Sequence, residues 1–204
     1  MRRLHLLLCV VALCASWSRA TVIWNESING DLSNNQAAPT PLTLASGTNS
    51  VVGTTAAGDQ DWLALTIPAG FQLSSDVLES YASTDSQGFT GVQAGSSFVG
   101  NPETTPSAYL GYAHFGTAAS NGALGTTDLV GVNLLPIMGN TADASGSQGF
   151  TPPLGAGTYT FLIQQTGATT AYQFDFGVTS VPEPGSLCLV GLAATMALRR
   201  RTGR

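Results

Sequence analysis

Apolar and polar residues alternate along three short stretches of the chain, at 62–67, 158–163 and 172–178. This alternation is typical of β-strands that bury one face, because successive side chains point to opposite faces of a sheet. Leu162 then lies on the opposite face of its strand. The residues expected to face the core are Leu63, Leu65, Ile67, Tyr159, Phe161, Ile163, Tyr172, Phe174, Phe176 and Val178.

Weaker alternation predicts further strands, separated by turns that contain glycine and proline. We find no helical periodicity between residues 21 and 180. Short strands with frequent turns predict an all-β fold, an antiparallel β-sandwich or jelly roll of about 8–10 strands. Residues 116–127 and 138–153 are almost all small or polar and are expected to form long surface loops or a flexible low-complexity insert. The weaker strand candidates are 41–45, 50–54, 76–83, 89–93, 109–115 and 129–135.

The first 20 residues have the pattern of a secretory signal peptide, with two early arginines and an apolar stretch. Ser18 and Ala20 stand where a signal peptidase needs small residues. The apolar stretch is shorter than the roughly 20 residues that a membrane span requires, which disfavours an uncleaved anchor. Leu13, rather than a small residue, precedes Cys14, which disfavours a lipoprotein signal. We therefore expect a signal helix within 1–20 that is cleaved after Ala20.

Positive charge is confined to the two ends of the chain. All seven arginines lie in residues 1–20 and 199–204, and there is no lysine. Of the twelve acidic residues only Glu183 lies outside 21–180, so this segment has eleven carboxylates and a formal charge of −11. Nucleic acid is excluded as a partner, because its binding depends on lysine and arginine. All three cysteines also lie outside this segment, which excludes disulfides and thiol chemistry within it.

The last 24 residues combine two prolines, an apolar run and an arginine cluster. Pro182 and Pro184 hold the chain extended around Glu183. Residues 185–198 are uncharged and mostly apolar. They predict a helix of roughly 21 Å, which is marginal for a hydrocarbon layer of roughly 30 Å. The arginines at 199–201 favour the cytoplasmic side. We expect an extended peptide held just outside a membrane by a weak transmembrane helix, where a processing enzyme can reach it.

This arrangement resembles the PEP-CTERM sorting signal. The resemblance implies export by a Gram-negative bacterium, recognition by an exosortase, and a transient anchor in the inner membrane. It further implies delivery to the cell surface, the outer envelope or an extracellular matrix, with exopolysaccharide as a possible partner. An ordinary tail anchor is the alternative. The residues that carry the resemblance are Val181, Pro182, Glu183, Pro184, Arg199, Arg200 and Arg201.

Two stretches, 58–70 (GDQDWLALTIPAG) and 153–178 (PLGAGTYTFLIQQTGATTAYQFDFGV), resemble the bacterial pre-peptidase C-terminal domain. Residues 29–44 are similar to the usual opening of such modules. The resemblance implies a small β-sandwich that binds or accompanies another molecule rather than catalysing a reaction. The interval 88–151 is longer than in these modules, so it leaves the strand count and topology of that region open.

Two polar regions contain oxygen ligands of the kind that Ca²⁺ prefers. Glu26, Asn29 and Asp31 lie in an early loop, and Asp59 and Asp61 flank the start of a strand. Some modules of the family that the domain resembles bind calcium with acidic residues in these two regions. The sequence therefore suggests Ca²⁺ as a cofactor. The alternative is that both acidic turns are merely solvated.

Candidates for catalysis are few. His114 is the only histidine after the signal segment, and it lies between aromatic residues in an expected strand. Asp76 with Glu79, or Asp59 with Asp61, would imitate the carboxylate pair of a glycosidase. The sequence has no nucleophile elbow, zinc-protease motif, Walker loop or dinucleotide fingerprint. We therefore expect no enzyme, with a secreted hydrolase as the second alternative.

Aromatic side chains offer a further alternative, a secreted carbohydrate-binding module, if they line one surface. Core filling explains the same residues, because the domain contains few leucines and isoleucines. We favour three parts: a signal peptide (1–20), an exported β-sandwich with a structural or adhesive role (21–180), and a sorting signal (181–204). The aromatic candidates are Trp24, Trp62, Tyr81, Tyr109 and Tyr112.

Overall fold

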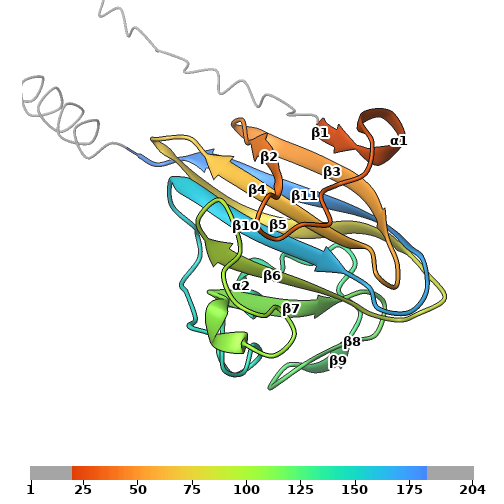
Figure 1. Ribbon diagram of the computed structural model, residues 1–204. Helices are drawn as coiled ribbons and strands as arrows, with labels where there is room; N and C mark the ends of the chain where they lie inside the picture. The colour runs from red at the N-terminus through yellow and green to blue at the C-terminus, as the bar shows by residue number, and fades with distance from the viewer. Residues whose placement is uncertain (1–19, 183–204) are drawn as a thin grey trace, which may run out of the picture.

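Two β-sheets packed face to face form the domain (Figure 1). The structure is a computed structural model and describes residues 20–182. The first sheet has the order β1 (Thr21–Asn25), β3 (Gly47–Thr55), β11 (Thr170–Ser180) and β5 (Phe71–Ala82). The second sheet has the order β2 (Thr40–Thr43), β4 (Gln60–Ile67), β10 (Gly157–Gln164), β6 (Gly88–Ala94) and β7 (Gly111–Phe115).

The predicted all-β sandwich is confirmed. The three strongly alternating stretches lie within β4, β10 and β11, and five of the six weaker ones overlap strands of the two sheets. Pairing is antiparallel except for the edge pairs β1–β3 and β2–β4, which are parallel. These pairs are parallel because the chain leaves β1 through α1 (Glu26–Asn29), adds β2 to the second sheet, and only then returns as β3.

The predicted strand at 129–135 is wrong. Here the chain makes a turn and enters the short helix α2 (Leu135–Gly139). Pro136, which has no N–H to donate, suits a first helical turn better than a strand interior. The apolar residues instead pack against β5 and β7 and bury Leu135, Ile137 and Met138.

The predicted loop regions are partly structured. A small hairpin, β8 (Ala119–Asn121) and β9 (Gly125–Thr127), interrupts the predicted loop at 116–127. A 3-10 turn, η1 (Pro106–Ala108), precedes β7. Beyond the end of α2, residues 140–153 contain no strand or helix, as expected for a loop.

The main core lies between the two sheets. Nine of the ten residues predicted to face it are buried, and Tyr159 packs against it half-buried. Phe115 and Phe174 meet edge to face with ring centroids 5.1 Å apart, and Phe161 and Phe176 do so at 5.6 Å. These contacts join β7 and β10 of the second sheet to β11 of the first. Apolar burial therefore holds the sandwich together, in a domain that has no lysine or arginine for ion pairs.

A second, smaller core lies on the outer face of the second sheet. Leu162 points to this face, as predicted, and Trp62 does so too. Both pack against Phe98 and Tyr109 from the segment between β6 and β7. Gly91 makes room for this cover, because a Cβ there would lie 2.4 Å from Tyr109 Cε1. The segment therefore covers part of the outer face and leaves the rest accessible.

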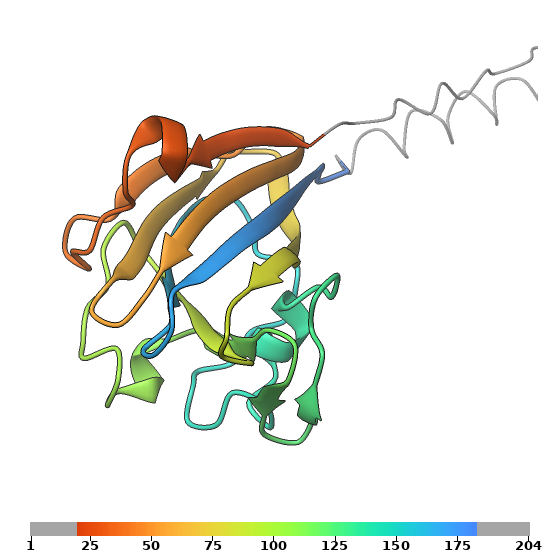
Figure 2. The same ribbon diagram turned by 90° about the vertical axis from the view of Figure 1, so that its right-hand side faces the viewer.

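The two ends of the described chain lie together. The start of β1 and the end of β11 lie at the same end of the first sheet (Figure 2), and Thr21 pairs with Asn49, which pairs with Phe176. We call this the near end; the far end is where β3 and β10 finish and β4, β6 and β11 begin. No helix within residues 20–182 is long and apolar enough to span a membrane. The helices predicted within 1–20 and 185–198 fall outside the described residues, apart from Ala20.

Candidate functional site

Three carboxyl groups meet at the far end of the domain. One oxygen from each of Glu26, Asp31 and Asp61 lies within 4.8 Å of the others. Glu26 opens α1, which is capped by Asn25, whose Oδ1 accepts a hydrogen bond from Ser27 N at 3.0 Å. The chain then reverses, and Asp31 comes back beside Glu26 while Asp61 reaches the same place from β4. Three of the five predicted calcium ligands are thus brought together.

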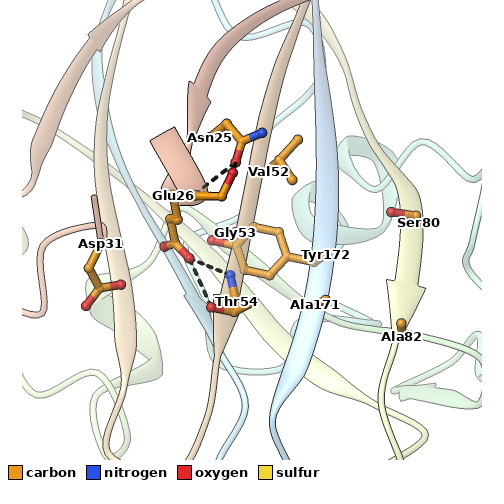
Figure 3. A pocket seen from close by; sticks show the side chains of 11 residues that line it. Asn25, Glu26, Asp31, Val52, Gly53, Thr54, Ser80, Ala82, Ala171 and Tyr172 are labelled. Carbon is orange, nitrogen blue, oxygen red and sulfur yellow. Dashed lines mark hydrogen bonds between the residues drawn. The ribbon is translucent and has the colours of Figure 1, made fainter. Parts of the chain in front are cut away.

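The Glu26 carboxylate is fixed by hydrogen bonds from two segments. Its Oε2 accepts from Thr54 N at 2.6 Å and Thr54 Oγ1 at 3.1 Å, and its Oε1 accepts from Leu32 N at 3.3 Å. Figure 3 shows the carboxylate lying between Thr54 and Asp31. A pocket of about 640 Å³ opens here, lined by α1 and the far ends of β3, β11 and β5. The carboxyl group is therefore positioned before any ligand arrives.

Asp61 is fully buried, and only one of its oxygens has a partner. Its Oδ2 accepts a hydrogen bond from the Tyr172 hydroxyl at 2.7 Å. Its Oδ1 is buried without a hydrogen bond from any residue of the described chain. The tyrosine reaches this position because residue 53 is glycine, where a Cβ would lie 2.5 Å from Tyr172 Oη and 3.0 Å from Glu26 Cδ.

Burial and mutual repulsion shift the pKa values of this group upward. The pKa of Asp61 is raised to about 8, chiefly by burial and also by the nearby carboxylates of Glu26 and Asp59, against the Tyr172 hydrogen bond, which lowers it. Burial also raises the pKa values of Glu26 and Asp59. No lysine or arginine occurs within residues 20–182 to offset these charges. The cluster consequently favours a positive ion or bound protons.

The other two predicted calcium ligands lie near the three-carboxyl cluster but make separate contacts. Asn29 Oδ1 accepts from Asn25 N at 2.9 Å and closes the turn of α1. Asp59 Oδ1 accepts from Asn34 Nδ2 at 3.2 Å. Their oxygens support the loops that surround the cluster.

The candidate catalytic residues lie in different surroundings. His114 is half-buried on β7, and burial lowers its pKa. Asp76 is fully buried inside the sandwich, whereas Glu79, on the same strand, is exposed. Burial raises the pKa of Asp76 to about 8, and neither of its carboxyl oxygens is hydrogen-bonded within residues 20–182. The structure therefore separates Asp76 from Glu79.

Most of the five aromatic candidates fill cores, as the core-filling interpretation expected. Trp62 and Tyr109 are 0% and 1% exposed, and Trp24 and Tyr81 pack against the main core. Tyr112 alone of the five lies half-buried on the outer face of the second sheet.

Sequence reasoning missed Tyr172 and Gly53 as parts of the acidic site. Tyr172 was assigned to the core from the alternation of its strand, and its burial there is confirmed. A signal was available, since a buried tyrosine hydroxyl needs a hydrogen-bond partner. No pattern distinguished Gly53 from the other glycines, because the contact it permits joins residues far apart in the sequence.

Fold and site together define the class of this protein: a two-sheet β-domain with an acidic site at the end opposite its chain termini. Residues 180–201 match the family model of the PEP-CTERM protein-sorting motif. The chain therefore carries the C-terminal motif of PEP-CTERM proteins, as its sequence suggested. The motif implies exosortase processing, membrane association of the C-terminal segment, and export to the envelope or the extracellular space. None of the curated proteins and none of the solved structures matches the chain.

The motif follows the fold without a spacer. Val181 N donates a hydrogen bond to Gly70 O at 2.8 Å, and Val181 and Pro182 are exposed. The remaining motif residues, Glu183, Pro184 and Arg199 to Arg201, fall outside the described part of the chain, as do all of the signal-segment residues before Ala20.

Proposed function

We propose that this is a non-catalytic structural or adhesive protein of the cell surface or extracellular matrix of a Gram-negative bacterium. The sorting motif at residues 180–201 carries the proposal. A signal peptidase would cleave after Ala20, and the C-terminal segment would anchor the protein transiently in the inner membrane until an exosortase acts. The resemblance to pre-peptidase C-terminal modules supports a role in binding rather than catalysis.

The orientation of the domain relative to its chain ends supports a role at the cell surface. Both ends of the described chain leave at the near end, where the motif begins at the last strand (Figure 2). The acidic cluster lies at the far end, where β4 and β11 begin. While the C-terminal segment is anchored, this cluster would point away from the membrane. The polar features of the domain are thus placed where an external ligand or matrix component arrives.

Calcium suits the cluster at the far end. Ca²⁺ takes six to eight oxygen ligands, and carboxylates are its preferred protein ligands. Glu26, Asp31 and Asp61 would each supply an oxygen, and waters or backbone carbonyls would complete the shell. The buried Asp61 Oδ1, which lacks a partner within residues 20–182, is the observation that favours a bound cation over a solvated cluster. The ion would supply positive charge in a segment without lysine or arginine and would tie α1 to β4.

The absence of catalysis is part of the proposal. Asp76 and Glu79 are divided between the interior and the surface, and His114 stands on a strand beside Phe89. A hydrolase would need an acid and a base that face one substrate. If a hydrolytic activity were found that disappears in the double variant His114→Ala, Asp61→Ala, the protein would be an enzyme and this part of the proposal would fall.

Mass spectrometry of the protein from cells and culture medium tests the sorting function. We expect an N-terminus at Thr21 and a C-terminus changed by exosortase processing in the exported material. Glu183→Ala should leave the protein membrane-associated with an intact C-terminus, whereas Glu79→Ala, at an exposed position on β5, should be processed like the wild type. Soluble cytosolic protein that retains both Met1 and Arg204 would refute the proposed route.

A further inference from the structure

One row of side chains crosses the outer face of the second sheet at the far end. Gln60 of β4, Gln164 of β10, Phe89 of β6 and His114 of β7 are direct cross-strand neighbours in that order. The next row toward the near end is covered by the segment between β6 and β7, which forms the second core. Four strands spaced about 4.8 Å apart make the open row about 14 Å long.

Adjoining hollows make this row a groove. A hollow of about 380 Å³ extends from Gln164 past Gln60 to Asp59, and one of about 210 Å³ lies between Phe89 and His114. Both are lined by Gln164, so they meet at the middle of the row. A third, of about 260 Å³, continues from Phe89 to Tyr112. The groove is thus polar at its β4 side and aromatic at its β7 side.

A chain of hydrogen bonds orients the amide in the middle of the groove. Trp62 Nε1 can only donate, and it donates to Gln60 Oε1 at 3.2 Å. This fixes the Gln60 amide so that its Nε2 donates to Gln164 Oε1 at 2.7 Å. Gln164 is 9% exposed, and its Nε2 donates to no group in residues 20–182. The buried tryptophan therefore makes Gln164 Nε2 a fixed hydrogen-bond donor with its partner position open.

The β7 side of the groove offers flat apolar surface. The rings of Phe89 and Tyr112 stack with centroids 5.5 Å apart at an interplanar angle of 29°, and both are half-buried. Tyr112 is held by its hydroxyl, which donates to Ser145 O at 2.7 Å. Rigid aromatic faces beside an oriented amide suit a ligand that has both C–H faces and hydroxyl groups, as sugars have.

The negative charge of the groove favours neutral sugars over anionic ones. Asp59 and Glu103 line the groove, and residues 21–180 have eleven carboxylates without lysine or arginine. A uronate, sulfate or phosphate would be repelled and would find no cation to pair with. A neutral chain meets no such barrier.

We propose that this groove binds a neutral oligosaccharide segment of a polysaccharide, with Phe89 and Tyr112 stacking on a sugar ring and Gln164 Nε2 donating to a sugar oxygen. The site extends the proposed adhesive role by naming a class of ligand. It rests on that role only for the location, outside the cell, where the protein meets the ligand. It uses no residue of the acidic cluster.

Native affinity electrophoresis tests the proposal with the full-length protein in a polyoxyethylene detergent, which contains no sugar to compete. The gels contain mixed-linkage β-glucan, galactomannan or dextran as neutral probes, and alginate as the anionic probe. We expect retardation by at least one neutral polysaccharide and none by alginate. Gln164→Glu keeps the acceptor for Gln60 but removes the open donor, so the apparent Kd should rise about tenfold. Phe89→Leu keeps the apolar volume without the flat ring and should raise it about threefold to tenfold.

Matched variants separate this site from the proposed calcium site. Gln72→Glu makes the same change on the first sheet, where Gln72 Nε2 contacts Thr179, and each polysaccharide should retard it as much as the wild type, measured against a sugar-free gel. Asp31→Asn should keep full retardation whatever its effect on calcium binding. The proposal is overturned if no neutral polysaccharide retards the protein, if alginate retards it more strongly, or if Gln164→Glu and Phe89→Leu behave like Gln72→Glu.

Discussion

Asp61 and Asp76 are the two fully buried carboxyl groups within residues 20–182, and their surroundings differ. Asp61 lies at the far end beside Glu26, Asp31 and the hydroxyl of Tyr172. Asp76 lies nearer the middle of β5, and both of its oxygens are buried without a hydrogen bond from the described residues. Burial raises both pKa values to about 8.

The comparison shows that burial alone does not define a site. Asp61 shares its position with other oxygen ligands, so a cation could satisfy the whole group at once. Asp76 belongs to no such group within residues 20–182, and protonation relieves the cost of burying its charge. The same raised pKa thus marks a ligand cluster in one region and a pH-sensitive position of the core in the other.

The largest expected effect comes from Asp76. Its folded pKa lies above the ordinary value of 3.8, so the folded state retains a proton that the unfolded state loses as the pH rises. Stability is therefore fullest near pH 4, falls as the pH rises, and levels off above about pH 8. A shift from 3.8 to about 8 corresponds to a loss on the order of 5 kcal/mol between these limits. Urea unfolding of the full-length protein in EDTA at pH 5 and pH 9 measures this loss together with the similar loss expected from Asp61.

Substitution of Asp76 tests how much of the pH dependence of stability this residue causes. Asp76→Asn removes the titration of this residue and should flatten about half of the dependence between pH 5 and pH 9, because Asp61, whose pKa is raised to about the same value, contributes the rest. Asp128→Asn is the matched control, because Asp128 is exposed and its Oδ1 accepts a hydrogen bond from Val130 N, which an amide oxygen can also do. An equally steep pH dependence in Asp76→Asn and in the wild type would show that Asp76 is not the group responsible.

Calcium should act on the far end and leave Asp76 unaffected. If Glu26, Asp31 and Asp61 hold the ion, millimolar Ca²⁺ should raise the melting temperature of the wild type above its value in EDTA. At a hundredfold excess over Kd the gain is about 2.7 kcal/mol. Asp31→Asn should lose most of this gain, and Asp128→Asn should keep it. An identical melt in Ca²⁺ and EDTA would leave Asp61 as a buried acid like Asp76.

Much of the fold could be predicted from the sequence, because alternation is a local signal. Spacing alone assigns Phe174 and Phe176 to the core and Leu162 to the opposite face of its strand, and the structure confirms both. The segment from 129 to 135 was not correctly assigned, since its apolar residues fit either a strand or a short helix until their packing against β5 and β7 is known. The parallel edge pairs were also beyond reach, because no local pattern records that the chain changes sheets after β1.

The acidic site could be predicted in part. Residue type and order pointed to Glu26, Asp31 and Asp61, because acidic turns next to strands are visible in the sequence. The hydrogen bond from Tyr172 to Asp61 depends on Gly53, whose missing side chain makes room for the tyrosine ring. The groove depends on the strand register that places Gln60, Gln164, Phe89 and His114 side by side. Registers between strands that are distant in sequence follow from the whole packing and not from any one stretch.

The smallest expected effect comes from Tyr172→Phe, which makes the surroundings of Asp61 resemble those of Asp76. Tyr172→Phe removes the hydroxyl that donates to Asp61 Oδ2, so both oxygens then lack a donor among residues 20–182. In EDTA the free energy of unfolding should fall by about 1 kcal/mol. The pKa of Asp61 should rise further, because this hydrogen bond lowers it in the wild type.

Carboxyl ¹³C chemical shifts followed through a pH titration measure the change at Asp61 directly. Tyr81→Phe is the control: Tyr81 is half-buried and pairs with Tyr172 across β5 and β11, but its hydroxyl donates to the backbone carbonyl of Asp85 at 2.9 Å and not to a buried acid. It should cost similar or less stability and leave the titration of Asp61 unmoved. If Tyr172→Phe also leaves that titration unmoved, the tyrosine does not distinguish the two carboxyls. The difference between the two regions would then rest on Glu26 and Asp31 alone.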